Sequence, residues 1–294
     1  MWLNRILRSL FMRSGASAAR SATSHADGPG SSPHLEAAWA VPSQTQCLVC
    51  AGTCRLLDGV DFNKSCEEAR GKYLPLSGLI VYYYVCEQCG FCFAPEFSGW
   101  SQDQFQQEIY NDEYVHVDPD YVDVRPRSNA AALISLLGNH AAEITHLDYG
   151  GGGGLLSALL RDANWQSTSY DPFPDQHRAI DRLGRFDLIT AFEVFEHVPD
   201  VQALMSRLSL LLAQPGLVLF STLLSDDHVK PEERMSWWYA APRNGHVSLF
   251  SRQSLAVLGS THGFSFGSLS ENFHAFWKEV PDWATGLFQK PRHD

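Results

Sequence analysis

The fold of this chain is decided by the stretch His146-Leu147-Asp148-Tyr149-Gly150-Gly151-Gly152-Gly153-Gly154. The apolar lead-in around Ile144 and Leu147 predicts a buried strand, and residues 155–160 predict the helix that follows it. Glycine tolerates positive φ and lets a ligand approach the backbone, and the first turn of a helix offers N–H groups without intrahelical partners. The stretch therefore predicts a nucleotide-binding turn at the carboxyl edge of an open α/β sheet, with a flexible glycine linker as the alternative.

Two acids frame this turn. Asp148 begins the pattern Asp-x-Gly-x-Gly-x-Gly, in which the glycines are Gly150, Gly152 and Gly154. Asp171 ends the next predicted strand, residues 167–170, where a carboxylate can accept hydrogen bonds from both ribose hydroxyls. Dinucleotide sites place their acid after the second strand, so an acid ahead of the glycines is unusual for them.

The third element is Phe186-Asp187-Leu188-Ile189-Thr190-Ala191-Phe192-Glu193-Val194-Phe195-Glu196-His197. Together, the three elements resemble the class I S-adenosylmethionine (SAM)-dependent methyltransferases, in the branch with a Glu-Val-x-Glu-His signature that includes quinone-biosynthesis O-methyltransferases. The resemblance covers about residues 129–280 and implies a Rossmann-like α/β sheet with SAM as cofactor. The residues that it places against SAM are Asp148, Gly150, Gly152, Gly154, Asp171, Phe192 and Glu193.

One departure from the family concerns the third strand. Only residues 172–185 separate Asp171 from the strand that ends at Glu193, which is too short for a full strand and helix. The sheet is therefore expected to be shortened around strand 3. The adenine-binding acid that normally follows that strand has no secure counterpart here.

The remaining elements continue the alternation of strand and helix. Helices are expected at 129–137 and 201–213 and from the cap Ser251 to Gly259, with a turn at Gln214-Pro215-Gly216. A buried strand is expected at 217–222, and a closing antiparallel hairpin at 264–270 and 273–280. The irregular, aromatic insertion 226–244 would then lie above the carboxyl edge, where substrates bind.

Four residues carry the predicted chemistry: Glu193, Glu196, His197 and His246. In one role, His246 or His197 is a general base, since imidazole titrates near neutral pH. In the other, the four side chains bind a second divalent ion that orients and acidifies a hydroxyl, which resembles metal-dependent 2′-O-methyltransferases of small RNAs and quinone-biosynthetic O-methyltransferases. A purely structural role is the third interpretation.

The seven cysteines favour metal ligation over disulfides, because their number is odd and their spacing is clustered. The pairs Cys47/Cys50 and Cys86/Cys89 form two Cys-x-x-Cys knuckles, which predict a closed, structural zinc site. The alternatives are buried free thiols or a redox pair. Three further cysteines have no assigned role, namely Cys54, Cys66 and Cys92, although Cys54 and Cys92 lie near enough in sequence to substitute as ligands. This N-terminal zinc module resembles that of sugar C-methyltransferases.

Composition limits the partners. The chain of 294 residues has a net charge of −11, from 22 basic and 33 acidic residues. Such a composition does not favour the positively charged surface that binds the phosphates of a nucleic acid. Residues 1–20 differ, because they carry four arginines, no acid, and apolar residues at helical spacing. This segment is an organelle-targeting leader, an amphipathic helix with peripheral membrane contact through residues 1–13, or a frayed terminus. We expect a cytoplasmic protein, with organelle targeting or a membrane-peripheral location as alternatives.

The chain is thus expected to comprise a basic leader and linker (1–44), a zinc-binding module (45–97), an aromatic helical connector (98–128), a methyltransferase domain (129–280) and a tail (281–294). By resemblance, Tyr110 or Tyr114 of the connector touches substrate; the alternative is aromatic packing between domains. The expected function is methyl transfer from SAM to the oxygen or carbon of a small-molecule, sugar-linked or lipid-linked acceptor. The rival functions are an NAD-dependent oxidoreductase and a non-catalytic adaptor.

Overall fold

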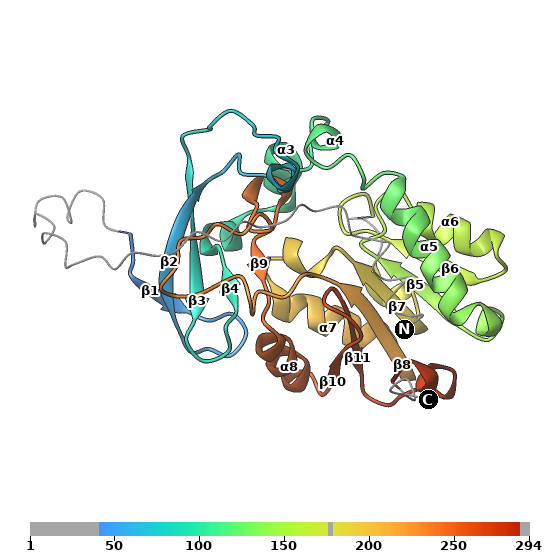
Figure 1. Ribbon diagram of the computed structural model, residues 1–294. Helices are drawn as coiled ribbons and strands as arrows, with labels where there is room; N and C mark the ends of the chain where they lie inside the picture. The colour runs from blue at the N-terminus through green and yellow to red at the C-terminus, as the bar shows by residue number, and fades with distance from the viewer. Residues whose placement is uncertain (1–40, 176–178, 289–294) are drawn as a thin grey trace, which may run out of the picture.

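The computed structural model describes residues 41–175 and 179–288, and the strands within those ranges form two sheets (Figure 1). The basic leader, the proposed membrane contact through residues 1–13 and the end of the tail lie outside the described residues. In Figure 1 the smaller sheet lies on the left, the larger sheet on the right, and β9 between them.

The larger sheet has the strand order β10-β11-β8-β7-β5-β6. Its parallel strands are β5 (Thr145–Tyr149), β6 (Gln166–Tyr170), β7 (Phe186–Phe192) and β8 (Leu212–Ser221). The antiparallel hairpin β10 (Ser265–Ser268) and β11 (Phe273–Trp277) closes it against β8. This is the predicted Rossmann-like methyltransferase sheet. Among the described residues β6 is the edge strand next to β5, so the predicted shortening of the sheet around strand 3 is confirmed.

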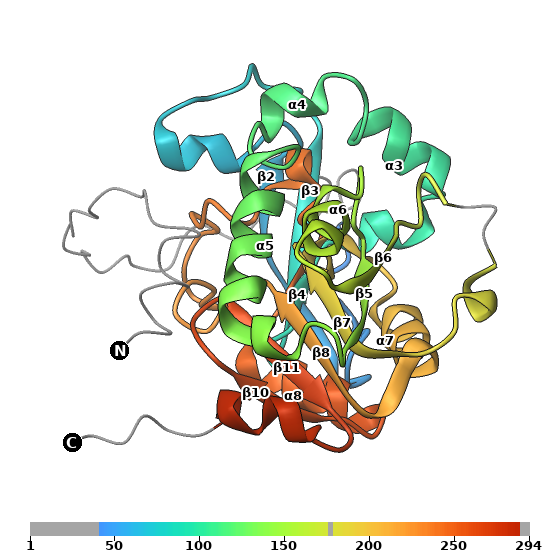
Figure 2. The ribbon, with the colours of Figure 1, turned by 90° about the vertical axis from the view of Figure 1, so that its right-hand side faces the viewer.

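Helices cover both faces of this sheet. In β8, Leu217 and Leu219 join a core cluster with α5 (Val124–Leu137) and α6 (Leu155–Asp162), which lie in front of the sheet in Figure 2. Val218 and Phe220 alternate with them and join the cluster of α7 (Val201–Leu211) and α8 (Arg252–Thr261) on the other face. A parallel strand buried on both faces needs this continuous apolar pattern.

Several predicted boundaries shift. Helix α5 begins at Val124 instead of 129, since Pro126 is tolerated in a first turn, where N–H groups have no intrahelical partner. Helix α7 ends at Leu211, and the expected turn at Gln214-Pro215-Gly216 lies inside β8, where the register with β7 shifts. Ser251 caps α8 as predicted, because its side chain accepts the N–H of Ser254.

The smaller sheet has the strand order β1-β2-β3-β4-β9 and is antiparallel throughout. Four of its strands come from the N-terminal part, namely β1 (Gln44–Gln46), β2 (Thr53–Asp61), β3 (Ile80–Cys86) and β4 (Cys92–Phe93). The fifth, β9 (Ser248–Leu249), directly follows the loop that contains His246. The N-terminal sheet therefore contacts the predicted catalytic loop through backbone hydrogen bonds.

The connector between the sheets contains α3 (Gln102–Glu108) and α4 (Tyr114–Val117). At the other end of the chain, a 3-10 helix at Asp282–Phe288 packs the buried Ala284 into the same cluster as α5 and α6. No helix among the described residues has the length and apolar character to cross a membrane.

Candidate active site

The glycine turn after β5 has a defined conformation. Gly150, Gly152 and Gly154 all have positive φ, at 77°, 51° and 76°. A side chain at position 150 would place its Cβ 2.5 Å from Cγ2 of Val194, so both sterics and backbone conformation require glycine there. The N–H of Gly150 donates to the carbonyl of Tyr170 at 2.8 Å. The alternative of a flexible linker is therefore wrong.

Asp171 lies beside this turn, because the parallel strands β5 and β6 end together, with Tyr149 opposite Tyr170. Its Oδ2 accepts the N–H of Gly152 at 2.9 Å, and its Oδ1 accepts the N–H of Phe173 at 2.9 Å. Burial raises the pKa of this carboxyl. Each carboxylate oxygen has two lone pairs, so Asp171 can still accept hydrogen bonds from a ribose while it holds the turn.

Asp148 belongs to a buried polar network that crosses three strands. Its Oδ1 accepts the hydroxyl of Thr190 at 3.0 Å, and Nε2 of His146 lies 3.0 Å from the same hydroxyl oxygen. On the other side, Nδ1 of His146 lies 2.8 Å from Oγ of Ser167. Burial raises the pKa of Asp148 to about 7 and lowers that of His146 to about 3. The partners of Asp148 were not found from the sequence, since their strand positions are polar residues without a motif.

Phe192, the last residue of β7, and Glu193, which follows it, were also expected beside SAM. The ring of Phe192 packs against Phe273 at a centroid distance of 5.1 Å. Glu193 has φ 54°, a left-handed conformation that is uncommon for a non-glycine residue and that occurs preferentially at functional sites. Its N–H donates to Oγ of Ser221, and that hydroxyl donates to its Oε1, both at 2.9 Å. Its Oε2 lies 3.9 Å from a guanidinium nitrogen of Arg125.

Three of the four predicted catalytic residues come together. Glu196 and His197 lie in the 3-10 turn that follows β7, and His246 lies in the loop before β9. One ligand atom from each lies within 4.8 Å of the other two, and the two imidazole centroids are 4.8 Å apart. This clustering of Glu196, His197 and His246 is confirmed, whereas Glu193 turns toward Arg125 and Ser221 and is not part of the group.

Tyr239 supports two members of this group. Its hydroxyl donates to Oε1 of Glu196 at 2.6 Å, and its backbone carbonyl lies 2.8 Å from Nδ1 of His246. A carbonyl only accepts, so Nδ1 of His246 carries the hydrogen and Nε2 carries the lone pair. The second oxygen of Glu196, Oε2, is buried without a hydrogen-bond partner among the described residues. The sequence identified Tyr239 only as part of an aromatic insertion, and its role was missed.

Burial sets the protonation of this group. It raises the pKa of Glu196 to about 8, to which the nearby Glu193 adds. It lowers the pKa of His197 to about 3 and that of His246 well below its usual value. Both imidazoles are therefore neutral at pH 7, which is the form that ligates metals.

The aromatic connector contacts the group from outside. The hydroxyl of Tyr110 lies 3.1 Å from Nδ1 of His197, and the hydroxyl of Tyr114 donates to the carbonyl of Asn244 at 3.2 Å. Gly245 makes this approach possible, because at its φ of 85° a Cβ would lie 2.6 Å from the Tyr110 hydroxyl. Both tyrosines thus adjoin the site, while their contact with a substrate stays a prediction.

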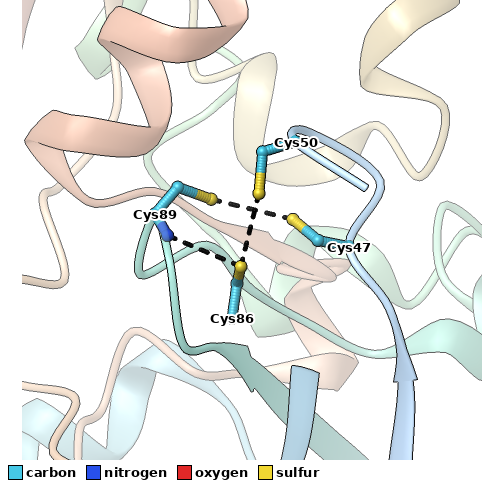
Figure 3. A group of neighbouring side chains, drawn as sticks. All are labelled: Cys47, Cys50, Cys86 and Cys89. Carbon is cyan, nitrogen blue, oxygen red and sulfur yellow. Dashed lines mark hydrogen bonds between the residues drawn. The ribbon is translucent and has the colours of Figure 1, made fainter. Parts of the chain in front are cut away.

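The four cysteines of the two knuckles also converge (Figure 3). The Sγ atoms of Cys47 and Cys89 are 3.7 Å apart, and those of Cys50 and Cys86 are 3.5 Å apart. Zinc–sulfur bonds of about 2.3 Å in a tetrahedron place sulfurs roughly 3.8 Å apart, so this set fits zinc. Backbone N–H groups also point at the sulfurs, as from Val49 to Cys47 at 3.3 Å.

The other cysteines are placed differently. Cys54 lies at the start of β2, opposite Cys86 of β3, and Cys92 is buried in β4. The Sγ of Cys66 lies 3.7 Å from Nδ1 of His246. None of these three belongs to the four-thiol group found among the described residues.

Comparison with known proteins identifies the class. A family model described as a methyltransferase domain matches residues 121–268, half of the chain. The chain therefore belongs to this methyltransferase family, and its larger sheet is that of the class I SAM-dependent methyltransferases.

Individual relatives match over shorter stretches. The chain is 37% identical over 57 residues to the ubiquinone biosynthesis O-methyltransferase of Colwellia psychrerythraea. This match covers 19% of this chain and 23% of the relative. It is 31% identical over 93 residues to the protein of the same name from Psychrobacter arcticus. That match covers 31% of this chain and 36% of the relative. The chain thus spans less than half the length of these curated relatives.

A solved structure matches more of the chain at lower identity. It is the Burkholderia thailandensis 1,6-didemethyltoxoflavin-N1-methyltransferase, with bound 1,6-didemethyltoxoflavin and S-adenosylhomocysteine. It is 17% identical, with a TM-score of 0.41, and the match covers 67% of this chain and 98% of that one.

The raised pKa of Asp148 makes a prediction about stability. The pKa of Asp148 is higher in the folded protein than in the unfolded chain. The protonated carboxyl therefore contributes fully to the free energy of unfolding below pH 4, and this contribution is lost as pH rises toward 7. Relative to Asp148→Asn, the free energy of unfolding of the wild type should fall by up to about 1.4 kcal/mol per pH unit in that window. Urea unfolding of both proteins from pH 5 to pH 8 measures this, and a pH-independent difference would contradict it.

Proposed function

We propose that this chain transfers the methyl group of SAM to a hydroxyl of a small-molecule acceptor, with a divalent cation held by Glu196, His197 and His246. The observation that carries this proposal is the buried, unpartnered Oε2 of Glu196 beside two neutral imidazoles. A buried polar atom without a partner is costly and rare, so its presence in a cluster of ligand atoms supports a bound ion. The relatives named as O-methyltransferases point to the same chemistry.

The surroundings of these side chains support ligation over general-base catalysis. An efficient base has a pKa near the working pH, whereas burial lowers the pKa of His197 to about 3. A metal-binding histidine typically donates its other N–H to a carbonyl or carboxylate, as Nδ1 of His246 does to Tyr239. Mixed carboxylate and imidazole ligands suit Mg, Mn or Zn.

Each part of the site would then have a separate task. The glycine turn and Asp171 would hold SAM, and the end of β7 would place its methyl group near the ligand cluster. The divalent ion would orient the acceptor hydroxyl and lower its pKa. Methyl transfer is an in-line displacement, so alignment of the oxygen with the sulfur–methyl bond is the main requirement.

We also propose that Cys47, Cys50, Cys86 and Cys89 hold a structural zinc ion. The four thiolates would complete a tetrahedral shell without an open position, which excludes a reaction at that metal. The ion would tie the turn between β1 and β2, which holds Cys47 and Cys50, to the end of β3 and the turn after it, which hold Cys86 and Cys89.

The cofactor assignment is tested by calorimetry with SAM and NAD. The wild type should bind SAM and not NAD, and Asp171→Ala should raise the Kd for SAM roughly tenfold or more, since hydrogen bonds to a charged group contribute about 1.5–3 kcal/mol. Asp162→Ala, an exposed acid at the end of α6, is the matched control and should bind SAM as the wild type does. An unchanged Kd for Asp171→Ala removes that residue from the cofactor site.

The ligand cluster is tested with Mn²⁺ as the probe. The wild type should bind one Mn²⁺ outside the thiolate site, measured by electron paramagnetic resonance of the free ion, and His246→Ala should weaken this binding. In a screen of phenols, catechols and sugars for release of S-adenosylhomocysteine, the same variant should lose roughly several hundredfold or more in turnover while SAM affinity is kept, since a bound ion contributes several kcal/mol to the transition state.

His140→Ala is the control for that experiment, since His140 is half-buried, pairs with Glu143 and lies outside the ligand cluster. EDTA should abolish turnover and Mn²⁺ or Mg²⁺ should restore it, with the zinc content monitored in parallel. Turnover that survives EDTA would assign a base role to the histidines, and no turnover with any acceptor would favour the non-catalytic adaptor. Product analysis by nuclear magnetic resonance distinguishes O- from C-methylation.

For the thiolate site, one equivalent of zinc should co-purify with the wild type. Cys86→Ser should lose most of it and unfold the N-terminal sheet at lower temperature, because zinc binding is coupled to folding. Cys92→Ala, buried but outside the four-thiol group, should keep the metal. Elemental analysis that finds no zinc in the freshly purified wild type would end this proposal.

A further inference from the structure

Lys64, in the turn after β2, reaches from the N-terminal sheet into the aromatic insertion. Its Nζ donates to the backbone carbonyl of Trp237 at 2.6 Å and to that of Ala240 at 2.8 Å. Its own backbone carbonyl accepts the N–H of Arg243 at 3.2 Å. A single residue thus contacts the insertion at three points that are more than 170 positions away in sequence.

The charged ammonium of Lys64 is bound by backbone carbonyls in place of a carboxylate. The ammonium is partly buried, and within the part of the chain that the structure describes it forms no ion pair. Burial lowers the pKa of Lys64. Removal of a cation from water is unfavourable unless donors and acceptors compensate it, so the two carbonyls are a specific arrangement and not an incidental surface contact.

The two carbonyls flank Tyr239. This tyrosine donates its hydroxyl to Glu196 and accepts the Nδ1 hydrogen of His246 on its backbone carbonyl. Lys64 therefore fixes the backbone on both sides of the residue that orients two of the three ligands. A shift of about 1 Å in such a support can lower turnover by two orders of magnitude.

Other N-terminal residues hold the same loop further along. The hydroxyl of Tyr83 donates to the carbonyl of His246 at 2.7 Å, and the N–H of Cys66 donates to Oδ1 of Asn244 at 2.8 Å. The N–H of Ala94 donates to the carbonyl of Val247 at 3.0 Å. Lys64 differs from these residues because its side chain contacts the carbonyls on both sides of Tyr239.

We propose that Lys64 is a positioning residue for the candidate active site, which holds Tyr239 so that Glu196 and His246 keep their orientation toward a bound cation. This rests on the proposed function. It assigns to the N-terminal sheet a direct part in building the ligand cluster.

The test compares Lys64→Met with the wild type, using Mn²⁺ and SAM as probes. Lys64→Met keeps the length of the side chain and removes the donors, so the Kd for Mn²⁺ should rise about tenfold while the Kd for SAM stays within about twofold. With any acceptor found in the screen, kcat should fall roughly 10- to 100-fold. Lys64→Arg, which can donate to both carbonyls, should restore most of the Mn²⁺ affinity.

Lys72→Met is the matched control, because Lys72 lies in the same module, is exposed, and pairs with Glu67. It should leave both Kd values unchanged. Wild-type Mn²⁺ affinity in Lys64→Met overturns the proposal, and so does a parallel loss of SAM affinity, which would indicate a general effect on folding. If Lys64→Met does not fold, Lys64→Gln takes its place with the same criteria.

Hydrogen exchange separates this proposal from the proposed function. If the wild type binds no Mn²⁺ and transfers no methyl group, the proposed function fails. Faster amide exchange confined to residues 237–246 in Lys64→Met would still support the positioning of Tyr239, and unchanged exchange there would overturn it.

Discussion

The antiparallel pairing of β4 with β9 is the interaction on which the rest of this structure depends. Cys92 pairs with Leu249 and Phe93 with Ser248, so two residues of the catalytic half of the chain complete the N-terminal sheet. Side chains follow the backbone, since the ring of Phe250 contacts both Phe91 and Phe195. The two sheets therefore share one hydrophobic cluster, and the buried His246 lies two residues before the strand that joins them.

Two buried polar groups, one within the larger sheet and one in the loops beside it, differ in how their hydrogen-bonding atoms are paired. The network of Asp148, Thr190 and His146 satisfies its members within the protein, so it stabilises the strands without a ligand. In the cluster of Glu196, His197 and His246, one carboxylate oxygen has no hydrogen-bond partner among the described residues. An unsatisfied buried group lowers stability, so a protein retains one where function requires it. The second group therefore has the character of a functional site.

The sequence predicted much of the fold. The parallel strands, the closing hairpin and the shortening of the sheet around strand 3 follow from local patterns, because apolar runs, glycine turns and connection lengths are properties of neighbouring residues. The glycine turn and Asp171 were found for the same reason, since both lie directly after their strands. Boundaries were less reliable, as at Pro126 and Gln214-Pro215-Gly216, where helix and strand continue through residues that usually interrupt them.

The sequence by itself thus determined the class of protein, the succession of its strands and helices and the types of residue at the carboxyl edge of the sheet. Tertiary structure alone decided which of these residues meet. Glu193 and Glu196 are three positions apart, yet a left-handed backbone at Glu193 turns its side chain toward Arg125 and away from the cluster. Tyr239 and Lys64 carry no motif, and they matter because long-range pairing brings the N-terminal sheet against the insertion. Contacts between residues so far apart depend on the packing of whole elements, and no local pattern in the sequence encodes them.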